Sequence, residues 1–333
     1  MKAAILHGVD QPLAYEDAPD PQPGPGEVIV RLAAAALNHR DVWIQKGRYA
    51  GLKFPIILGS DGAGVVSGLG DGVDSAWLGR EVIVNPGTDW GDNPRAQSRG
   101  YRILGLPDNG TFAEAVKVSA QSLCVRPAHL SWSEAAALPL AGLTAYRALF
   151  TRAHLHSADR VLVTGVGGGV AIFALQFAVA CGAQVFVTSG SPAKLERARA
   201  MGAVGGALYR DENWPQTLKA ASGGFDLIVD GAGGAGFEQL VDLAAPGGRI
   251  VNYGATLGLP PGLDLRRVFW KQLDILGSTL GTADDFVALV QFVQTRHITP
   301  IVDQLFPLAE AEAAMRHMDA GRQFGKIVLR IGE

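Results

Sequence analysis

The sequence predicts an α/β protein in which a β-rich domain precedes a doubly wound parallel sheet. In the first third, short apolar runs such as residues 27–37 and 54–69 are separated by glycine and proline, which is typical of a small, partly open β-barrel. From about residue 126, helical patterns alternate with short apolar strands, which indicates a parallel sheet with helices on both faces. A chain of 333 residues, 48% of them hydrophobic, is long enough to bury two such cores.

The regular alternation ends near residue 264, so we expect domains at residues 1–125 and 126–264, followed by a tail at 265–333. In the tail we expect helices at 283–295 and 308–320 and a strand at 326–331. Because one strand and two helices make a poor third domain, this tail is expected to return to the first domain.

Composition excludes several classes of partner. The 29 basic and 32 acidic residues give a net charge of −3 with no basic run, so nucleic acid is not an expected partner. The two cysteines are far apart, which is typical of a cytoplasmic protein and not of a disulfide framework. The longest apolar stretch, residues 170–183, contains Gln176 and is too short to span a membrane. A small molecule is therefore the expected partner.

A glycine loop lies between a predicted strand, residues 160–165, and a predicted helix. Gly167, Gly168, Gly169 and Val170 form this loop, where backbone N–H groups and the helix dipole favour a pyrophosphate. A GxGxxG register starting at Gly165 ends on Val170. The register shifted by one residue ends on a small residue, Ala171, and is favoured because helix and strand then pack closely. A plain tight turn is the alternative.

The next predicted strand ends where an acidic residue would bind the ribose 2′-hydroxyl of NAD. This chain instead has Ser189 and Ser191, followed by Lys194. Without a carboxylate to repel it, a 2′-phosphate is accepted, so the expected cofactor is NADPH. A solvated helix face is the alternative for Lys194.

Seven short motifs extend over essentially the whole chain: Gly24 to Val28, Asn38 to Asp41, Pro55 to Gly64, Gly110 to Glu114, Ala136 to Pro139, Leu143 to Tyr146 and Phe324 to Val328. Together with the domain order, they resemble the medium-chain dehydrogenase/reductase superfamily. The resemblance implies a GroES-like catalytic domain and a Rossmann dinucleotide-binding domain.

Zinc ligands of that superfamily are missing from this chain. The position of its first cysteine ligand is Asn38, and its Gly-His-Glu motif reads Gly59, Ser60 and Asp61. Residues 85–110, which match its structural zinc segment, contain no cysteine. An isolated histidine such as His39 is more typical of packing than of a metal ligand, so we expect no bound metal.

The remaining pattern looks like the zinc-free quinone oxidoreductase branch, which includes enoyl-thioester reductases. Its N-x-x-D motif, followed by G-x-Y, is matched by Asn38, Asp41, Gly47 and Tyr49. The resemblance implies that Asn38 lies against the nicotinamide and that Tyr49 enters the substrate pocket as a proton donor. A role in the cleft wall is the alternative for Tyr49, and Asp41 is expected to orient the loop.

Further cofactor contacts are expected at three positions by resemblance and at two strand ends by their place at the carboxyl edge of the sheet. The positions implied by resemblance are Thr144, Tyr209 and Lys326. For Lys326, the alternative is an ordinary surface lysine. The strand-end positions are Gly231, Ala232, Tyr253, Gly254 and Ala255, where simple turns are the alternative.

The expected function is therefore that of an NADPH-dependent, zinc-independent reductase of quinones, enones or enoyl thioesters. Two alternatives stay open: a cofactor-binding sensor or structural protein with little turnover, and an alcohol dehydrogenase, against which the missing zinc ligands argue. We also expect a homodimer, because residues 248–255 and 265–278 leave an apolar sheet edge and the resembled family commonly associates in this way.

Overall fold

The computed structural model describes residues 1–332, which form two compact units. Unit 1 comprises residues 1–141 and 281–333, and unit 2 comprises residues 142–280. Both boundaries fall later in the chain than the sequence suggests. Helix α2 (Trp132–Ala137) packs against strands of unit 1, and strand β16 (Asp274–Gly277) is hydrogen-bonded to the sheet of unit 2, so each extends its unit.

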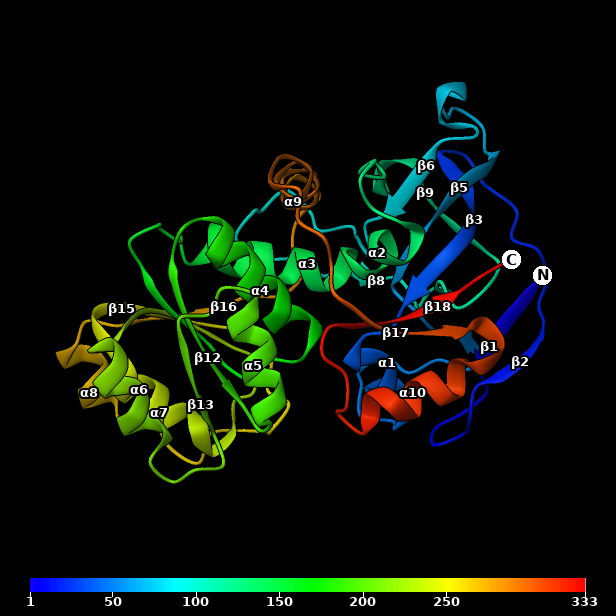
Figure 1. Cartoon of the computed structure of the whole chain (residues 1–333). Helices are drawn as coiled ribbons and strands as arrows, with labels where there is room; N and C mark the ends of the chain where they lie inside the picture. Colours follow the sequence, from blue (N-terminus) through cyan, green and yellow to red (C-terminus); the bar gives the residue numbers. More distant parts are fainter. Residues whose placement is uncertain (333) are drawn as a thin grey trace. The chain divides into compact units, whose positions relative to one another are not determined.

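Unit 1 is built around strand β3 (Glu27–Ala36), which pairs with three other strands. Its partners include β18 (Lys326–Arg330), which aligns Val328 with Ala36 in an antiparallel pair (Figure 1). The tail of the chain thus adds strands to the first sheet and brings Lys326 next to the end of β3.

The main sheet of unit 1 follows the order β10-β6-β5-β3-β18-β17, with β9 also paired to β3; smaller sheets are β2-β1-β4 and β7-β8. The remaining strands are β1 (Lys2–Leu6), β2 (Ala14–Asp17), β4 (Ile56–Ile57), β5 (Asp61–Leu69), β6 (Glu81–Val84), β7 (Gly87–Thr88), β8 (Arg102–Ile103), β9 (Ala115–Ser119), β10 (Leu123–Val125) and β17 (Val302–Pro307). The other helices are α1 (His39–Gln45), α9 (Ala283–Arg296) and α10 (Ala311–Asp319), while α3 (Pro139–Tyr146) crosses the unit boundary.

Unit 2 is a doubly wound sheet of six parallel strands in the order β13-β12-β11-β14-β15-β16, which confirms the predicted fold class. Helices α4 and α5 lie on one side of this sheet and α6 and α7 on the other (Figure 1). The strands are β11 (Arg160–Val163), β12 (Gln184–Ser189), β13 (Gly205–Leu208), β14 (Phe225–Asp230) and β15 (Ala244–Asn252), in addition to β16. The helices are α4 (Gly169–Ala180), α5 (Pro192–Ala200), α6 (Trp214–Ser222), α7 (Phe237–Leu243) and α8 (Leu265–Trp270).

The central strands β11 and β14 read as continuous apolar runs because both of their faces are covered. Val161, Leu162 and Val163 are fully buried, as are the middle residues of β14. The strand order reverses between β11 and β14, and open α/β sheets bind ligands at the carboxyl ends of the strands at such a point. The fold of unit 2 therefore directs attention to the loops after these two strands.

Among the helices formed by residues 1–332, none has the length and apolar character needed to cross a bilayer.

Candidate functional site

The glycine loop follows β11 at the carboxyl edge of the unit 2 sheet. Gly165 has φ 62° and Gly167 has φ 140°, which are conformations that residues with a side chain rarely adopt. Helix α4 starts at Gly169, and Gly168 before it supplies no capping side chain. A Cβ atom on Gly165 or Gly168 would meet nothing within 4 Å. The N-terminus of α4 is therefore open to an anion such as a pyrophosphate.

Beside this loop lie Ser189 and Ser191, at the end of β12. The Ser189 hydroxyl is buried and donates to the carbonyl of Val166, 3.3 Å away, so it holds the glycine loop in place. Ser191 is the N-cap residue of α5 and makes no capping bond with its side chain. Of the two hydroxyls, that of Ser191 is the one available to a ligand.

Lys194 and Tyr209 border the same region. A Cβ atom on Gly167 would lie 3.1 Å from Nζ of Lys194, so the ammonium group lies over the glycine loop. A Cβ atom on Gly190 would lie 2.4 Å from the Tyr209 hydroxyl, so that glycine allows the phenol to approach the turn after β12. The structure thus brings together four residues predicted to surround a 2′-phosphate.

The ends of β14 and β15 are tied together by Asp230, a residue that the sequence does not single out. Its buried carboxylate accepts hydrogen bonds from Oγ1 of Thr164 at 2.6 Å, from the backbone of Gly233 at 2.9 Å and from Nδ2 of Asn252 at 3.0 Å. Asp230 therefore fixes the loops that follow three parallel strands.

The strand-end residues predicted as cofactor contacts lie close to one another around this carboxylate. A Cβ atom on Gly231 would lie 2.4 Å from the Tyr253 ring, and one on Gly254 would lie 3.1 Å from the Gly231 carbonyl. The backbone N–H of Ala232 donates to Asp230 at 3.2 Å, and Ala255 packs against Gly233. Desolvation, together with the charge of Asp230, raises the pKa of the Tyr253 phenol, which keeps its proton and can donate it in a hydrogen bond.

The predicted catalytic residue Asn38 lies in unit 1, between β3 and α1, in a buried network with Asp61 and Lys326. Nζ of Lys326 is 2.7 Å from Oδ1 of Asn38 and 2.9 Å from Oδ2 of Asp61, and it also donates to the Leu37 carbonyl at 2.6 Å. Nδ2 of Asn38 donates to the same Asp61 oxygen at 2.9 Å. Lys326 is 2% exposed and Asp61 is fully buried, so each charge is balanced by the other.

A second buried cation, Arg40, lies next to this network. Its guanidinium donates to Oγ of Ser60 at 2.7 Å and to the Leu104 carbonyl at 2.8 Å. Its charged end is also stacked on the ring of Tyr49, 5.1 Å from the ring centroid. Tyr49 is half-buried, and its hydroxyl has no hydrogen-bond partner within the described part of the chain. The phenol is therefore held by its ring and keeps a free hydroxyl.

Asp41 and His39 begin helix α1. Oδ2 of Asp41 accepts the backbone N–H of Asn38 at 2.8 Å, so this carboxyl orients the loop as expected. Complete burial raises the pKa of Asp41 to about 6, although Arg40 and the Asn38 N–H act in the opposite direction. His39 is exposed at the surface, but partial desolvation of its ring and the nearby charge of Lys326 lower its pKa, which favours a neutral imidazole.

Two further expected cofactor contacts belong to other elements of the fold. Thr144 is a buried residue of α3, and Lys326 belongs to unit 1, where its ammonium group is fully engaged by Leu37, Asn38 and Asp61. The partners of Lys326 were not expected from the sequence, nor were the roles of Arg40 and Asp230. Asp61 and Lys326 are each a single charge within an otherwise apolar run, and this pattern is a usable signal of a buried ion pair.

Comparison with known proteins identifies the family. Residues 24–128 match the family described as "Alcohol dehydrogenase GroES-like domain", and residues 169–295 match the family described as "Zinc-binding dehydrogenase". The chain is 37% identical, over 96% of its length and 95% of the relative's, to the "Zinc-type alcohol dehydrogenase-like protein YogA" of Leptosphaeria maculans. The chain belongs to the medium-chain dehydrogenase/reductase superfamily and is an oxidoreductase with a Rossmann domain that binds NAD or NADP.

Other relatives differ in the activities that their names state. An "Acryloyl-coenzyme A reductase" of Sulfurisphaera tokodaii is 28% identical over 99% of this chain and 100% of its own. A solved structure named "NAD-dependent alcohol dehydrogenase" superposes with a TM-score of 0.94 at 40% identity, covering 100% of both chains. Another, the 2-octenoyl-CoA carboxylase reductase CinF in complex with NADP and 2-octenoyl-CoA, gives a TM-score of 0.88 at 26% identity over 96% of this chain and 82% of its own.

The zinc named in the family description does not fit the residues of unit 1. The two positions that the resemblance assigns to zinc ligands are Asn38, whose amide is bonded to Lys326 and Asp61, and Ser60, whose hydroxyl donates to the Leu104 carbonyl at 2.7 Å. An ammonium group beside the first position also repels a divalent cation. Within residues 1–332, no three His, Cys, Asp or Glu side chains are grouped so that they could hold a metal ion.

Proposed function

We propose that this protein is an NADPH-dependent, zinc-independent reductase that transfers hydride to a conjugated carbonyl acceptor: a quinone, an enone or an enoyl thioester. The observation that carries the proposal is that Asn38 is hydrogen-bonded to Lys326 and Asp61. At the position where the family's zinc enzymes have a metal ligand, this chain therefore has an amide held in a fixed orientation. When bound, the reduced nicotinamide supplies the hydride. The names of the acryloyl-CoA and 2-octenoyl-CoA reductases support an enoyl-type substrate.

The residues of unit 1 supply what an acceptor of hydride needs. Negative charge develops on the carbonyl oxygen of the substrate, and a positioned N–H or O–H stabilises it without a metal. Asn38 offers an amide N–H, and the unpartnered hydroxyl of Tyr49 can donate a proton. Arg40 keeps the Tyr49 ring in place, so that the hydroxyl has a defined position.

The region after β12 supports a preference for NADPH. Ser189, Ser191, Lys194 and Tyr209 form this region, and none of them carries the carboxylate that binds an NAD ribose. The glycine loop with α4 would hold the pyrophosphate, and the loops fixed by Asp230 would hold the nicotinamide half. Thr144 on α3 would make a further contact with the cofactor.

An alcohol dehydrogenase is the second candidate, because the similar structure named "NAD-dependent alcohol dehydrogenase" is 40% identical to this chain. One experiment separates the two candidates. Purified protein is mixed with NADPH or NADH and a panel of quinones, enones and enoyl thioesters, and separately with NAD or NADP and a panel of alcohols; absorbance of the reduced cofactor is followed. Turnover with acceptors and NADPH supports the proposal, whereas alcohol oxidation alone, or no turnover, contradicts it.

Zinc independence is tested by elemental analysis of protein purified without chelator. We expect far less than one zinc per chain, and the same activity before and after dialysis against a chelator. About one zinc per chain, lost together with activity, would contradict the proposal.

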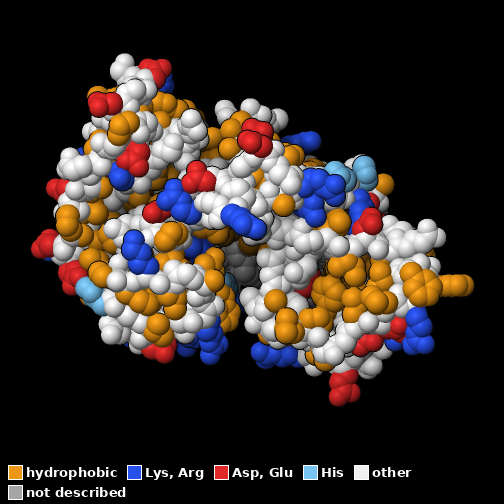
Figure 2. Space-filling view, turned by 180° about the vertical axis from the view of Figure 1, so that it is seen from behind, with side chains coloured by type: hydrophobic (Ala, Val, Ile, Leu, Met, Phe, Trp, Pro, Cys, Tyr) orange, Lys and Arg blue, Asp and Glu red, His pale blue; other side chains and the backbone are white. Residues whose placement is uncertain are grey.

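We further propose that the protein forms a homodimer through the edge of unit 2. Strand β16 is the last strand of the sheet, and Ile275 on it is exposed. Next to it, Phe269 and Trp270 at the end of α8 are exposed, Trp270 by 83%. Figure 2 shows hydrophobic side chains gathered over this part of unit 2. A second copy of the chain would cover both the open edge and these rings.

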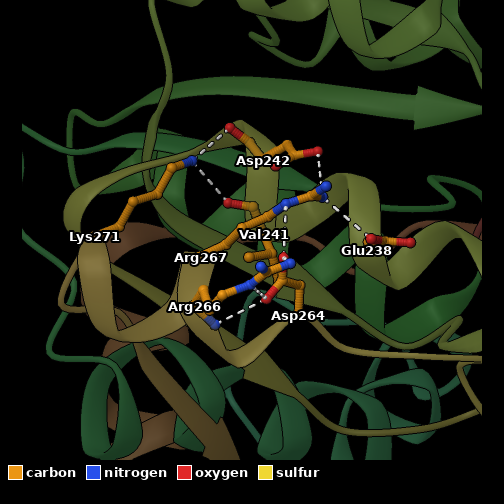
Figure 3. A network of polar contacts seen from close by, with 7 residues as sticks. All are labelled: Glu238, Val241, Asp242, Asp264, Arg266, Arg267 and Lys271. Carbon is orange, nitrogen blue, oxygen red and sulfur yellow. Dashed lines mark hydrogen bonds and ion pairs between the residues drawn. The ribbon is translucent and has the colours of Figure 1, made fainter.

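Helix α8 is anchored firmly enough to present these rings. Nζ of Lys271 donates to the carbonyls of Val241 and Asp242, and Arg267 pairs with Glu238 and Asp242 (Figure 3). These contacts tie α8 to both ends of α7, so little order has to be gained on association. Sedimentation should show a dimer or a larger assembly, and a monomer at micromolar concentration would contradict this proposal.

A further inference from the structure

The ion pair of Lys326 and Asp61 lies in the core of unit 1, with Asn38 bonded to both charges. The neighbouring side chains Leu37, Ile327 and Val328 are fully buried. Nζ of Lys326 has three N–H groups and three acceptors: Leu37, Asn38 and Asp61. The ammonium group therefore has no donor left for a cofactor or substrate, and any effect it has on a ligand passes through its neighbours.

The orientation of the Asn38 amide is determined by these charges. An ammonium group only donates, so the amide must turn Oδ1 toward Lys326 at 2.7 Å. A carboxylate only accepts, so the amide must turn Nδ2 toward Asp61 at 2.9 Å. The flipped amide would lose both hydrogen bonds in a buried environment, where each lost bond is costly.

One N–H of Asn38 is left over. Nδ2 has two N–H groups, of which one is bonded to Asp61, and residues 1–332 supply no partner for the other. Asn38 is 7% exposed, so a small part of its surface can be reached. The positive charge at Oδ1 also polarises the amide and makes the remaining N–H a stronger donor.

We propose that Lys326 is a positioning residue that presents the free N–H of Asn38 to the carbonyl oxygen of the acceptor substrate. The proposal rests on the proposed reductase function. Hydride forms a new C–H bond at the β-carbon of the acceptor, the π electrons of its C=C bond move onto the carbonyl oxygen, and a proton from Tyr49 or water then completes reduction at the α-carbon. The Asn38 N–H stabilises the charge on that oxygen at the intermediate stage.

The central variant is Lys326→Met combined with Asp61→Asn, which removes the ammonium group without leaving a buried carboxylate unpaired. With an enone as substrate, kcat should fall at least about tenfold, because the amide is no longer held in one orientation. Substrate KM should change little, and the NADPH Kd, measured by fluorescence, should stay within about twofold of the wild-type value. Lys117→Met, at an exposed ion pair with Glu27, is the matched control and should have no effect.

A mutant cycle separates positioning from a general structural effect. If Lys326 acts only through Asn38, adding Lys326→Met and Asp61→Asn to an Asn38→Ala enzyme should cause no further loss of kcat. An equal loss in both backgrounds would overturn the proposal. An unchanged kcat in the double variant, or a change confined to the NADPH Kd, would also overturn it. If the double variant does not fold, Lys326→Arg carries the same test, since its planar fork cannot reproduce the three ammonium bonds.

A measurement without turnover distinguishes this proposal from the proposed function. In the wild-type protein, NMR should detect a slowly exchanging side-chain N–H of Asn38, assigned by its loss in Asn38→Asp. The exchange should become at least about tenfold faster in the double variant, because the amide is no longer fixed. Unchanged exchange would overturn the orienting role of Lys326. A wild-type protein that reduces no acceptor, yet shows this signature, would remove the proposed function and leave the orienting role standing.

Discussion

The candidate sites of unit 1 and unit 2 consist of different kinds of chemical groups. In unit 1, charged side chains are buried and satisfied by one another, as in the pair of Lys326 and Asp61. In unit 2, backbone N–H groups at Gly167 to Gly169 form the glycine loop, the buried carboxylate of Asp230 holds the neighbouring loops, and outer ion pairs such as that of Arg267 with Glu238 are partly exposed. The buried charges of unit 1 are paired before a ligand arrives, whereas the glycine loop of unit 2 offers backbone donors that a ligand would pair.

This difference predicts which property of the protein a mutation in each unit should change. A closed network of buried charges has a fixed geometry and a high cost of disruption, so changes in unit 1 should alter stability and the rate of the chemical step. An open set of backbone donors gains its partners on binding, so changes around the glycine loop should alter cofactor affinity and choice. Four predictions test this contrast.

The largest effect is expected at Asp41, a buried carboxyl of unit 1. Its pKa is raised from 3.8 to about 6, so the folded protein binds its proton more tightly than the unfolded chain does. Stability from this group is present below about pH 4 and is lost as the pH rises through about 6. Asp41→Asn removes this dependence and keeps an oxygen acceptor for the Asn38 N–H. Between pH 3 and pH 8, which spans both pKa values, the wild type should lose about 3 kcal/mol of unfolding free energy relative to the variant.

Urea unfolding of both proteins at several pH values measures this change, and the other carboxyl groups cancel in the difference. Parallel stability curves for the two proteins would show that the burial of Asp41 has no energetic consequence. The comparison between the two units would then lose its clearest support.

Tyr49 comes next. Tyr49→Phe should lower kcat with an enone by roughly 10²-fold, because the proton donor is removed while the ring still packs on Arg40. The loss with a quinone should be far smaller, since hydroquinone oxygens can take protons from water. Steady-state kinetics with both substrates measure the change in kcat. An NADPH titration should show an unchanged Kd. A variant unimpaired on every substrate would return Tyr49 to a role in the cleft wall.

Ser191 tests the cofactor choice of unit 2. The burial of the Ser189 hydroxyl makes that position a poor one to change, whereas Ser191 is the N-cap of α5, where aspartate is also favourable. Ser191→Asp should shift the ratio of NADPH to NADH affinity by about tenfold toward NADH, because a carboxylate repels the 2′-phosphate and suits a ribose hydroxyl. Titration of both cofactors measures the shift; Ser191→Asn, of similar size without charge, is the control. Equal wild-type affinity for the two cofactors would contradict the NADPH assignment.

The smallest effect is expected at Arg267, whose ion pairs with Glu238 and Asp242 are partly exposed (Figure 3). Arg267→Ala should lower the unfolding free energy by less than about 1 kcal/mol, and added salt should reduce the difference further. Thermal unfolding at low and high salt measures this change. A loss as large as that expected at Asp41 would show that the exposure of a charged group does not determine how much it contributes to stability.

The sequence predicts unit 2 more completely than unit 1, because its signals are local. Alternating helices and strands specify the parallel sheet, and the glycines between residues 160 and 170 specify the loop before α4. The expected boundaries at 126 and 265 differ from those of the structure, since neither the packing of α2 nor the edge position of β16 can be read from neighbouring residues. The predicted contacts in unit 2 lie near one another because strand ends of a parallel sheet meet at one edge.

In unit 1, the residue types at the site can be read from the sequence, but their partners cannot. Asn38 and Tyr49 stand out by their motif, whereas the role of Arg40 depends on a ring nine residues further on and on the carbonyl of Leu104. Asp61 and Lys326 are each a lone charge in an apolar run, which indicates that each is buried against an opposite charge. This pattern does not identify the partner residue.

By itself, the sequence determined the doubly wound sheet, the open glycine loop and the absence of zinc-ligand side chains at Asn38 and Ser60, because backbone preferences and side-chain chemistry belong to each residue. Only the tertiary structure decided that Lys326 meets Asn38, 288 residues away, when β18 pairs with β3. The physical reason is that a buried ammonium group must find acceptors wherever the sheet places it, and strand pairing over such a separation is decided by the packing of the whole core.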